Sequence, residues 1–290
     1  EWLLLIFLPA WVVNRIIYLL PLLLRGFSMY YLLSTFIRRN DSISTFCKLL
    51  PSIFFVAIPL DVYVFPANSL YLAFMPLVMA LFIRGTLSDY KTTYIWLGAL
   101  SSMVLFGLPD LLAFTFILLF FYLILLIVES RKRVALLSYF LKFLAFVVLF
   151  NMITLFPLLM LRESTASYLT MLSSLLSEAN LIQAAPFTKL IFVSRMIVGN
   201  QASAQAPAFY FSSPVMVLLG FFMVAYCYTS VFLMGSREHR VRVFARWLII
   251  SALCVTLFAT GVTYPISGSI YLFFYGAIPG LLYNVTHLLY

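Results

Sequence analysis

Charged residues are scarce in this sequence. Asp, Glu, Lys and Arg together make up 9% of the 290 residues, whereas hydrophobic residues make up 64%. A soluble domain carries about 25% charged residues, because its surface must face water. A soluble protein of this size is therefore excluded, and lipid must surround most of the chain.

Histidine and cysteine are also few, and this excludes most metal and haem sites. The chain has two His and three Cys residues, which lie far apart along the sequence: His239, His287, Cys47, Cys227 and Cys254. Paired axial histidines, closed zinc sites and disulfide frameworks each need more ligands or closer spacing. We therefore expect no cofactor and no metal.

Several sequence signatures are absent as well. No phosphate-binding GxxxxGK[ST] loop, GxSxG turn or HExxH helix occurs. The net charge of +9 lies in short clusters between apolar runs, with no basic stripe interleaved with aromatics, so we expect no nucleic-acid partner. Nearly every acidic residue lies at the end of an apolar run, which disfavours an ion-coupled transporter.

What remains is a series of apolar runs separated by charges and turn residues. Such runs predict an all-α, polytopic transmembrane helical bundle with about nine spans. The first run is too long for one straight helix and contains Pro21 and Arg25-Gly26, so we expect one or more broken or re-entrant helices there. The predicted spans cover residues 2–37, 46–59, 70–83, 92–106, 111–128, 134–161, 209–234, 247–262 and 269 onward.

We predict a single transmembrane domain over residues 1–290, because no stretch has the composition of a soluble domain. Residues 162–208 are richer in Ser, Thr, Asn and Gln and include an amphipathic stretch at 168–176. This segment is predicted to be an external loop with one interfacial helix.

Basic residues predict the orientation. Of the 18 Lys and Arg residues, 13 lie in or beside one alternating set of loops, at 38–48, 84–91, 131–142 and 237–246. Because excess Lys and Arg marks the cytoplasmic side, we expect a multi-pass cell-membrane protein with these basic loops in the cytoplasm.

Two acidic residues in the opposite, external loops are candidates for a binding cavity. Asp61 follows Pro59, and Asp110 follows Pro109 directly before a long apolar run. One interpretation is that each caps a helix, since Asp accepts hydrogen bonds from free N–H groups at a helix start. The other is that both line an external cavity for a polar head group. The two interpretations are compatible.

Arg25 is the third candidate, because a guanidinium in an apolar run is costly unless it pairs, snorkels or faces water. Beside Gly26 and after Pro21, it is either an interfacial residue at a span end or a ligand for a lipid phosphate. The first interpretation is favoured, since Arg15 lies nearby.

A resemblance covers about half of the chain. The stretches RIIYLLPLLLRGFSMYYLL, PLDVYVFPANSLYLAFMPLVMALFIRG, VLFGLPDLLAFTFILLFFYLILL and NMITLFPLL follow one another, and GAIPGLLYNVTHLLY comes near the end. This order resembles the middle of GT-C-type membrane glycosyltransferases, especially the prokaryotic arabinofuranosyltransferase-like members. The resemblance implies a partner such as a polyprenyl-phosphate sugar as well as membrane lipids.

Members of that family carry an essential acidic residue in their first external loop, and no residue of this chain matches it. We therefore expect the isolated chain to transfer no sugar. An alternative function is a cofactor-free integral membrane subunit that anchors a larger complex, for example a respiratory or electron-transfer complex.

Overall fold

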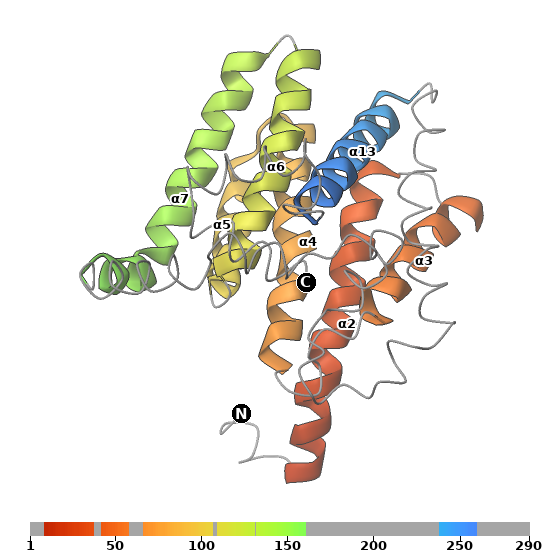
Figure 1. Cartoon of the computed structure of the whole chain (residues 1–290), viewed down its shortest axis with the longest axis vertical. Helices are drawn as coiled ribbons and strands as arrows, with labels where there is room; N and C mark the ends of the chain where they lie inside the picture. The colour runs from red at the N-terminus through yellow and green to blue at the C-terminus, as the bar shows by residue number, and fades with distance from the viewer. Residues whose placement is uncertain are drawn as a thin grey trace, which may run out of the picture. The chain divides into compact units, whose positions relative to one another are not determined.

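The computed structural model describes residues 9–37, 42–57, 66–106, 109–130, 132–160 and 238–259. These residues are helical apart from short turns, with no strand in the described ranges. The prediction of an all-α fold is confirmed for them. The helices are α2 (Ala10–Phe36), α3 (Ser42–Ala57), α4 (Pro66–Leu87), α5 (Thr92–Leu105), α6 (Pro109–Glu129), α7 (Arg133–Met160) and α13 (His239–Ala259), as Figure 1 shows.

Three helical segments in the described ranges are long and apolar enough to cross a membrane. They are Ala10–Phe36, Leu70–Leu87 and Arg133–Met152, and two shorter apolar helical segments are Thr92–Leu105 and Phe114–Glu129. A membrane core about 30 Å thick needs about 20 helical residues. The predicted spans at 209–234 and from 269 onward, and the loop at 162–208, lie outside the described residues.

The chain divides into two compact units, Glu1–Leu119 with Ile127–Met152, and Phe120–Leu126 with Ile153–Tyr290. The first unit contains α2 to α5 and most of α7. In the second, the Tyr122 and Trp247 rings meet edge-on with their centroids 6.1 Å apart, and Trp247 also contacts Phe244.

Helices α2 and α4 of the first unit pack side by side and run parallel. The Arg84 side chain, near the end of α4, hydrogen-bonds Ser34 and Thr35, near the end of α2. Helix α3 runs antiparallel to α2, since Arg25 contacts Phe55 while Lys48 contacts Tyr30.

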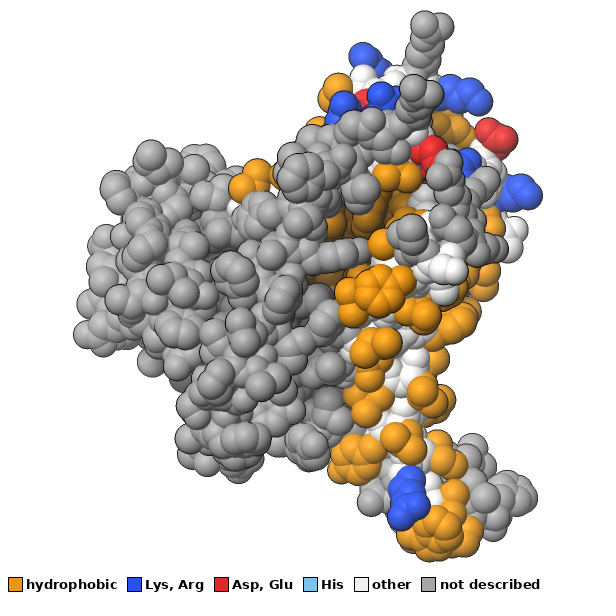
Figure 2. Space-filling view, turned by 90° about the vertical axis from the view of Figure 1, so that its right-hand side faces the viewer, with side chains coloured by type: hydrophobic (Ala, Val, Ile, Leu, Met, Phe, Trp, Pro, Cys, Tyr) orange, Lys and Arg blue, Asp and Glu red, His pale blue; other side chains and the backbone are white. Residues whose placement is uncertain are grey.

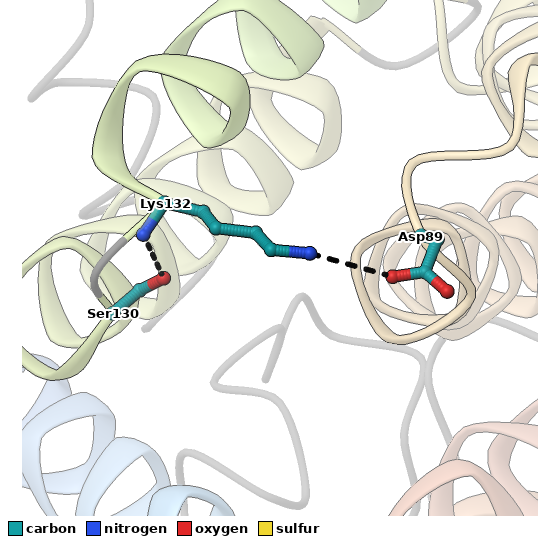
Figure 3. Close-up of polar contacts among 3 residues, drawn as sticks. All are labelled: Asp89, Ser130 and Lys132. Carbon is teal, nitrogen blue, oxygen red and sulfur yellow. Dashed lines mark hydrogen bonds and ion pairs between the residues drawn. The ribbon is translucent and has the colours of Figure 1, made fainter.

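The turns between these helices share one end of the first unit. The α4–α5 turn places Asp89 and Tyr90 at positive φ, 52° and 61°, and closes with Ser88 and Tyr90 N–H groups donating to the Gly85 carbonyl. The Lys132 ammonium, between α6 and α7, lies 3.9 Å from the Asp89 carboxylate, and the Lys132 N–H donates to Ser130 (Figure 3). The turn at 88–91 and Lys132 therefore lie at the same end of the first unit.

An aromatic cluster fills the core between α4 and α7. The Phe82 ring has its centroid within 6 Å of the rings of Tyr139, Phe140 and Phe143. Gly98 of α5 lies against this cluster, because a Cβ there would be 2.8 Å from the Phe143 ring and 3.6 Å from Leu81. The glycine allows α5 to pack closely against both α4 and α7.

Large apolar side chains remain exposed on the outer faces of these helices. Leu19, Leu23 and Phe27 recur every four residues along α2 and are between 56% and 69% exposed. On the face drawn in Figure 2, hydrophobic side chains cover much of the described surface and most charged side chains gather in one region. Such a surface is suited to lipid contact.

Two predicted boundaries are corrected. Residues 10–36 form one continuous helix that includes Pro21, Arg25 and Gly26, so no break occurs at these positions. Proline and glycine are tolerated in membrane helices because neighbouring groups satisfy the freed backbone. Helix α13 begins at His239, so most of the basic segment at 237–246, predicted to be a loop, is helical.

Candidate functional site

Arg25 lies inside the helix bundle and is not at a span end. Its side chain is 0% exposed, although it belongs to a helix that continues for eleven residues beyond it. The favoured interpretation of Arg25 as an interfacial residue is therefore wrong. The sequence suggested a helix end because Pro21 and Gly26 flank it, but the helix continues through both.

The guanidinium of Arg25 holds the end of helix α3. Its Nη2 donates a 2.6 Å hydrogen bond to the Phe55 carbonyl oxygen, and its Cζ lies 5.3 Å from the Phe55 ring centroid. In a continuing helix this carbonyl would accept from the N–H four residues later. That residue is Pro59, which has no N–H. Arg25 supplies the missing donor and places a positive charge at a helix C-terminus, where it is stabilising.

Gly26 makes this contact possible by letting α3 approach α2. A Cβ at Gly26 would lie 2.8 Å from Cγ2 of Val56 and 3.9 Å from the Ser52 carbonyl oxygen. Any larger side chain would separate the two helices next to Arg25. Glycine is therefore favoured at this position by packing and not by backbone conformation.

A second buried cation lies on the facing helix. Lys48 of α3 is 2% exposed, and its Nζ lies 5.8 Å from the centroid of the Tyr30 ring on α2. The buried hydroxyls of Ser28 and Ser52 donate to the carbonyls of Arg25 and Lys48. The α2–α3 interface thus contains two cations and two hydroxyls among apolar side chains. From sequence, Lys48 was counted only as a topology signal with the residues at 38–48, although it also lies inside the predicted span 46–59, in the apolar run CKLLPSIFF.

The helix rise gives the depth of these cations. Arg25 precedes Thr35, the residue bound to Arg84 near the helix ends, by ten positions, or about 15 Å along the axis. The hydrocarbon core of a bilayer is about 30 Å thick. If the helix ends mark the membrane surface, Arg25 lies near mid-depth, and Lys48, opposite Tyr30, lies about halfway between Arg25 and that surface.

The side chains of the two acidic candidates lie outside the described part of the structure. Asp61 lies outside the described residues. Asp110 is the second residue of α6, which begins at Pro109, so Pro109 takes the first helical position and Asp110 lies in the first turn. An acidic residue in the first turn still offsets the helix dipole. The external cavity that these residues would line stays a prediction.

The chemistry available at the α2–α3 interface is the binding of an anion. Arginine and lysine donate to phosphate or carboxylate oxygens, and their attraction to an anion is strong where water is excluded. No group of three or more His, Cys, Asp or Glu side chains suited to a metal occurs within the described ranges. No family model, curated protein or solved structure matches this chain.

Proposed function

We propose that this chain is a multi-spanning membrane protein that holds the anionic head group of a lipid or a lipid-linked sugar between α2 and α3. The observation that carries the proposal is the complete burial of Arg25 at a position deep along α2. Ionisable side chains inside a membrane bundle are costly and mark ligand or ion pathways more often than they serve packing. Lys48 adds a second positive charge to the same helix pair.

The resemblance to GT-C-type glycosyltransferases supports a lipid-linked sugar phosphate, such as a polyprenyl-phosphate sugar, as the ligand. In this proposal Arg25 and Lys48 bind the phosphate, and Asp61 and Asp110 line the external side of the cavity. The isolated chain binds this ligand without transferring the sugar. The protein lies in the cell membrane. In this orientation the turn at 88–91 and Lys132 face the cytoplasm.

Access to Arg25 requires a local separation of α2 and α3. Helix α3 ends at Ala57, two residues after the Phe55 carbonyl that Arg25 binds. An anion that enters at this end competes with the Phe55 carbonyl for the guanidinium. A phosphate offers oxygens that accept stronger, charge-assisted hydrogen bonds than a carbonyl does.

A purely structural role for Arg25 makes a different prediction. Arg25→Gln removes the positive charge but keeps an N–H donor for Phe55, whereas Arg25→Leu removes both. Native mass spectrometry of the purified full chain would identify the phosphate-containing lipids that remain bound. We expect Arg25→Gln to lose most of them and the exposed control Arg15→Gln, on the same helix, to retain them. If Arg25→Gln retains the same phosphate lipids as the wild type, and only Arg25→Leu is unstable, the role of Arg25 is structural.

A second candidate function is a membrane subunit that anchors a larger complex. Helix α7 exposes apolar side chains at alternating three- and four-residue intervals, the spacing of a helix–helix seam: Val134, Leu137, Leu141, Leu144 and Val148. A partner helix packed along this seam would support an anchoring function. Stoichiometric co-purification of another membrane subunit, lost in Leu141→Ser but not in Leu19→Ser of α2, would support this function over lipid binding.

A further inference from the structure

Arg84 is held in a fixed orientation at the shared end of α2 and α4. Its Nε donates to Thr35 Oγ1 at 3.2 Å, and its Nη2 donates to Ser34 Oγ at 3.1 Å. Its Cζ lies 3.7 Å from the centroid of the Tyr31 ring, so the guanidinium stacks on that ring. The Ser34 and Thr35 hydroxyls donate in turn to the Tyr31 carbonyl, which fixes both acceptors.

This arrangement leaves part of the guanidinium available. Arginine has five N–H donors in one plane, and the two contacts use one on Nε and one on Nη2. No described residue accepts from the other three, and the Arg84 side chain is only half-buried. The Nη1 and Nη2 nitrogens therefore both keep N–H donors. The Tyr31 ring and the two hydroxyls determine the orientation of these donors.

The location suits a lipid head group. Arg84 lies in the last turn of α4, four residues before the turn that contains Asp89. Arg38 and Arg39 come two and three residues after the last residue of α2 in the sequence. The apolar lengths of α2 and α4 extend away from this end, as Figure 1 shows for the two adjacent helices. A guanidinium there lies where the hydrocarbon core of a bilayer gives way to phosphates.

We propose that Arg84, oriented by Tyr31, Ser34 and Thr35, binds the phosphate of an anionic phospholipid in the leaflet at this end of the chain. The planar fork of arginine pairs with two phosphate oxygens at once, which a lysine ammonium does not do. The stacked ring reduces the conformational freedom that the side chain loses on binding. This site is distinct from the one around Arg25, and neither proposal depends on the other.

The test is a lipid titration of the full chain in detergent micelles, read as the dissociation constant of phosphatidylglycerol from native mass spectrometry. We expect Arg84→Gln to weaken binding at one site by about tenfold or more and Arg84→Lys to weaken it by a smaller factor. Lys91→Gln removes an exposed basic residue at the same end and should leave that site unchanged. Equal weakening in Lys91→Gln and Arg84→Gln would show diffuse charge attraction and overturn the proposal, as would unchanged binding in Arg84→Gln.

Two further measurements distinguish a lipid phosphate from free phosphate, and a loss of binding from a loss of folding. Inorganic phosphate should fail to displace phosphatidylglycerol, and displacement by millimolar inorganic phosphate would overturn the lipid assignment. Because Arg84 links two helices, Arg84→Gln can lower stability, so Tyr31→Leu serves as the second variant. It keeps the charge and both hydroxyls, and we expect it to weaken phosphatidylglycerol binding severalfold. Unchanged binding in this variant would show that the oriented guanidinium is not the site.

Discussion

The side-chain amide of Asn151 joins helices α7 and α5 by donating a 3.2 Å hydrogen bond to Ser102 Oγ. The same nitrogen also donates to the Val147 carbonyl at 2.7 Å, and the Ser102 hydroxyl donates to the Ala99 carbonyl. Both side chains are buried, at 2% and 0% exposure. A polar contact between two apolar helices fixes their register, because few other groups in that environment can replace it.

We predict that Ser102→Ala lowers the free energy of unfolding by about 1 kcal/mol, since one Asn151 donor then loses its acceptor. Ser101→Ala is the matched control, because among the described residues the Ser101 hydroxyl donates to the Leu97 carbonyl of its own helix and to no other helix. Thermal denaturation in one detergent measures both. Equal effects of the two substitutions would show that the contact with Asn151 contributes nothing.

Tyr139→Phe should leave stability unchanged or raise it by up to about 1 kcal/mol. The Tyr139 hydroxyl is buried against Gly85 and has no hydrogen-bond partner among the described residues. A buried hydroxyl without a partner is unfavourable, whereas the ring still packs on Phe82. The melting temperature of the purified variant tests this. A clear decrease would mean that the hydroxyl has a stabilising partner.

Gly26→Ala should destabilise the α2–α3 pair even though alanine is the better helix former by about 1 kcal/mol. The new Cβ would lie 2.8 Å from Val56 Cγ2, and such overpacking costs about 1–3 kcal/mol. The double variant Gly26→Ala with Val56→Ala should recover part of the loss, because the obstructing methyl group is gone. If Gly26→Ala alone is as stable as the wild type, the close approach beside Arg25 is not as described.

The two connected turns should be labelled from the same side of the membrane. In a background without Cys47, Cys227 and Cys254, single cysteines at Asp89 and Lys132 should both resist an impermeant maleimide added outside intact cells. The reason is the 3.9 Å contact between these residues together with the excess of basic residues on this side. Labelling of one position but not the other would contradict the fold. Labelling of both would reverse the orientation.

Most helices of the first unit could be predicted from hydrophobic length and turn residues. The predicted span 92–106 differs by one residue from α5, and 134–161 differs by one residue at each end from α7. Both begin beside a basic residue, Lys91 or Arg133, and they end before Gly107 and Arg162, so local sequence signals mark these boundaries.

The site was less predictable than the helices, because the burial of a cation depends on the neighbouring helix. Arg25 was singled out because it interrupts an apolar run, but its partner is a backbone carbonyl thirty residues away, which no side-chain pattern reveals. Lys48 was counted with the basic residues at 38–48, although the predicted span 46–59 includes it. Arg84 was counted only as a topology signal, although its contacts with Tyr31, Ser34 and Thr35 hold its guanidinium in one orientation.

The most direct test of the proposed function compares a polyprenyl phosphate with the uncharged polyprenol of the same chain length. Binding of each to the full chain in nanodiscs would be measured for the wild type, Arg25→Gln and the control Arg15→Gln. We predict that the wild type and Arg15→Gln bind the phosphate at least about tenfold more tightly than the alcohol, a difference of about 1.4 kcal/mol. Arg25→Gln should lose this preference while binding the alcohol as before. Equal affinity of the wild type for phosphate and alcohol, or a preference that survives in Arg25→Gln, would contradict the account.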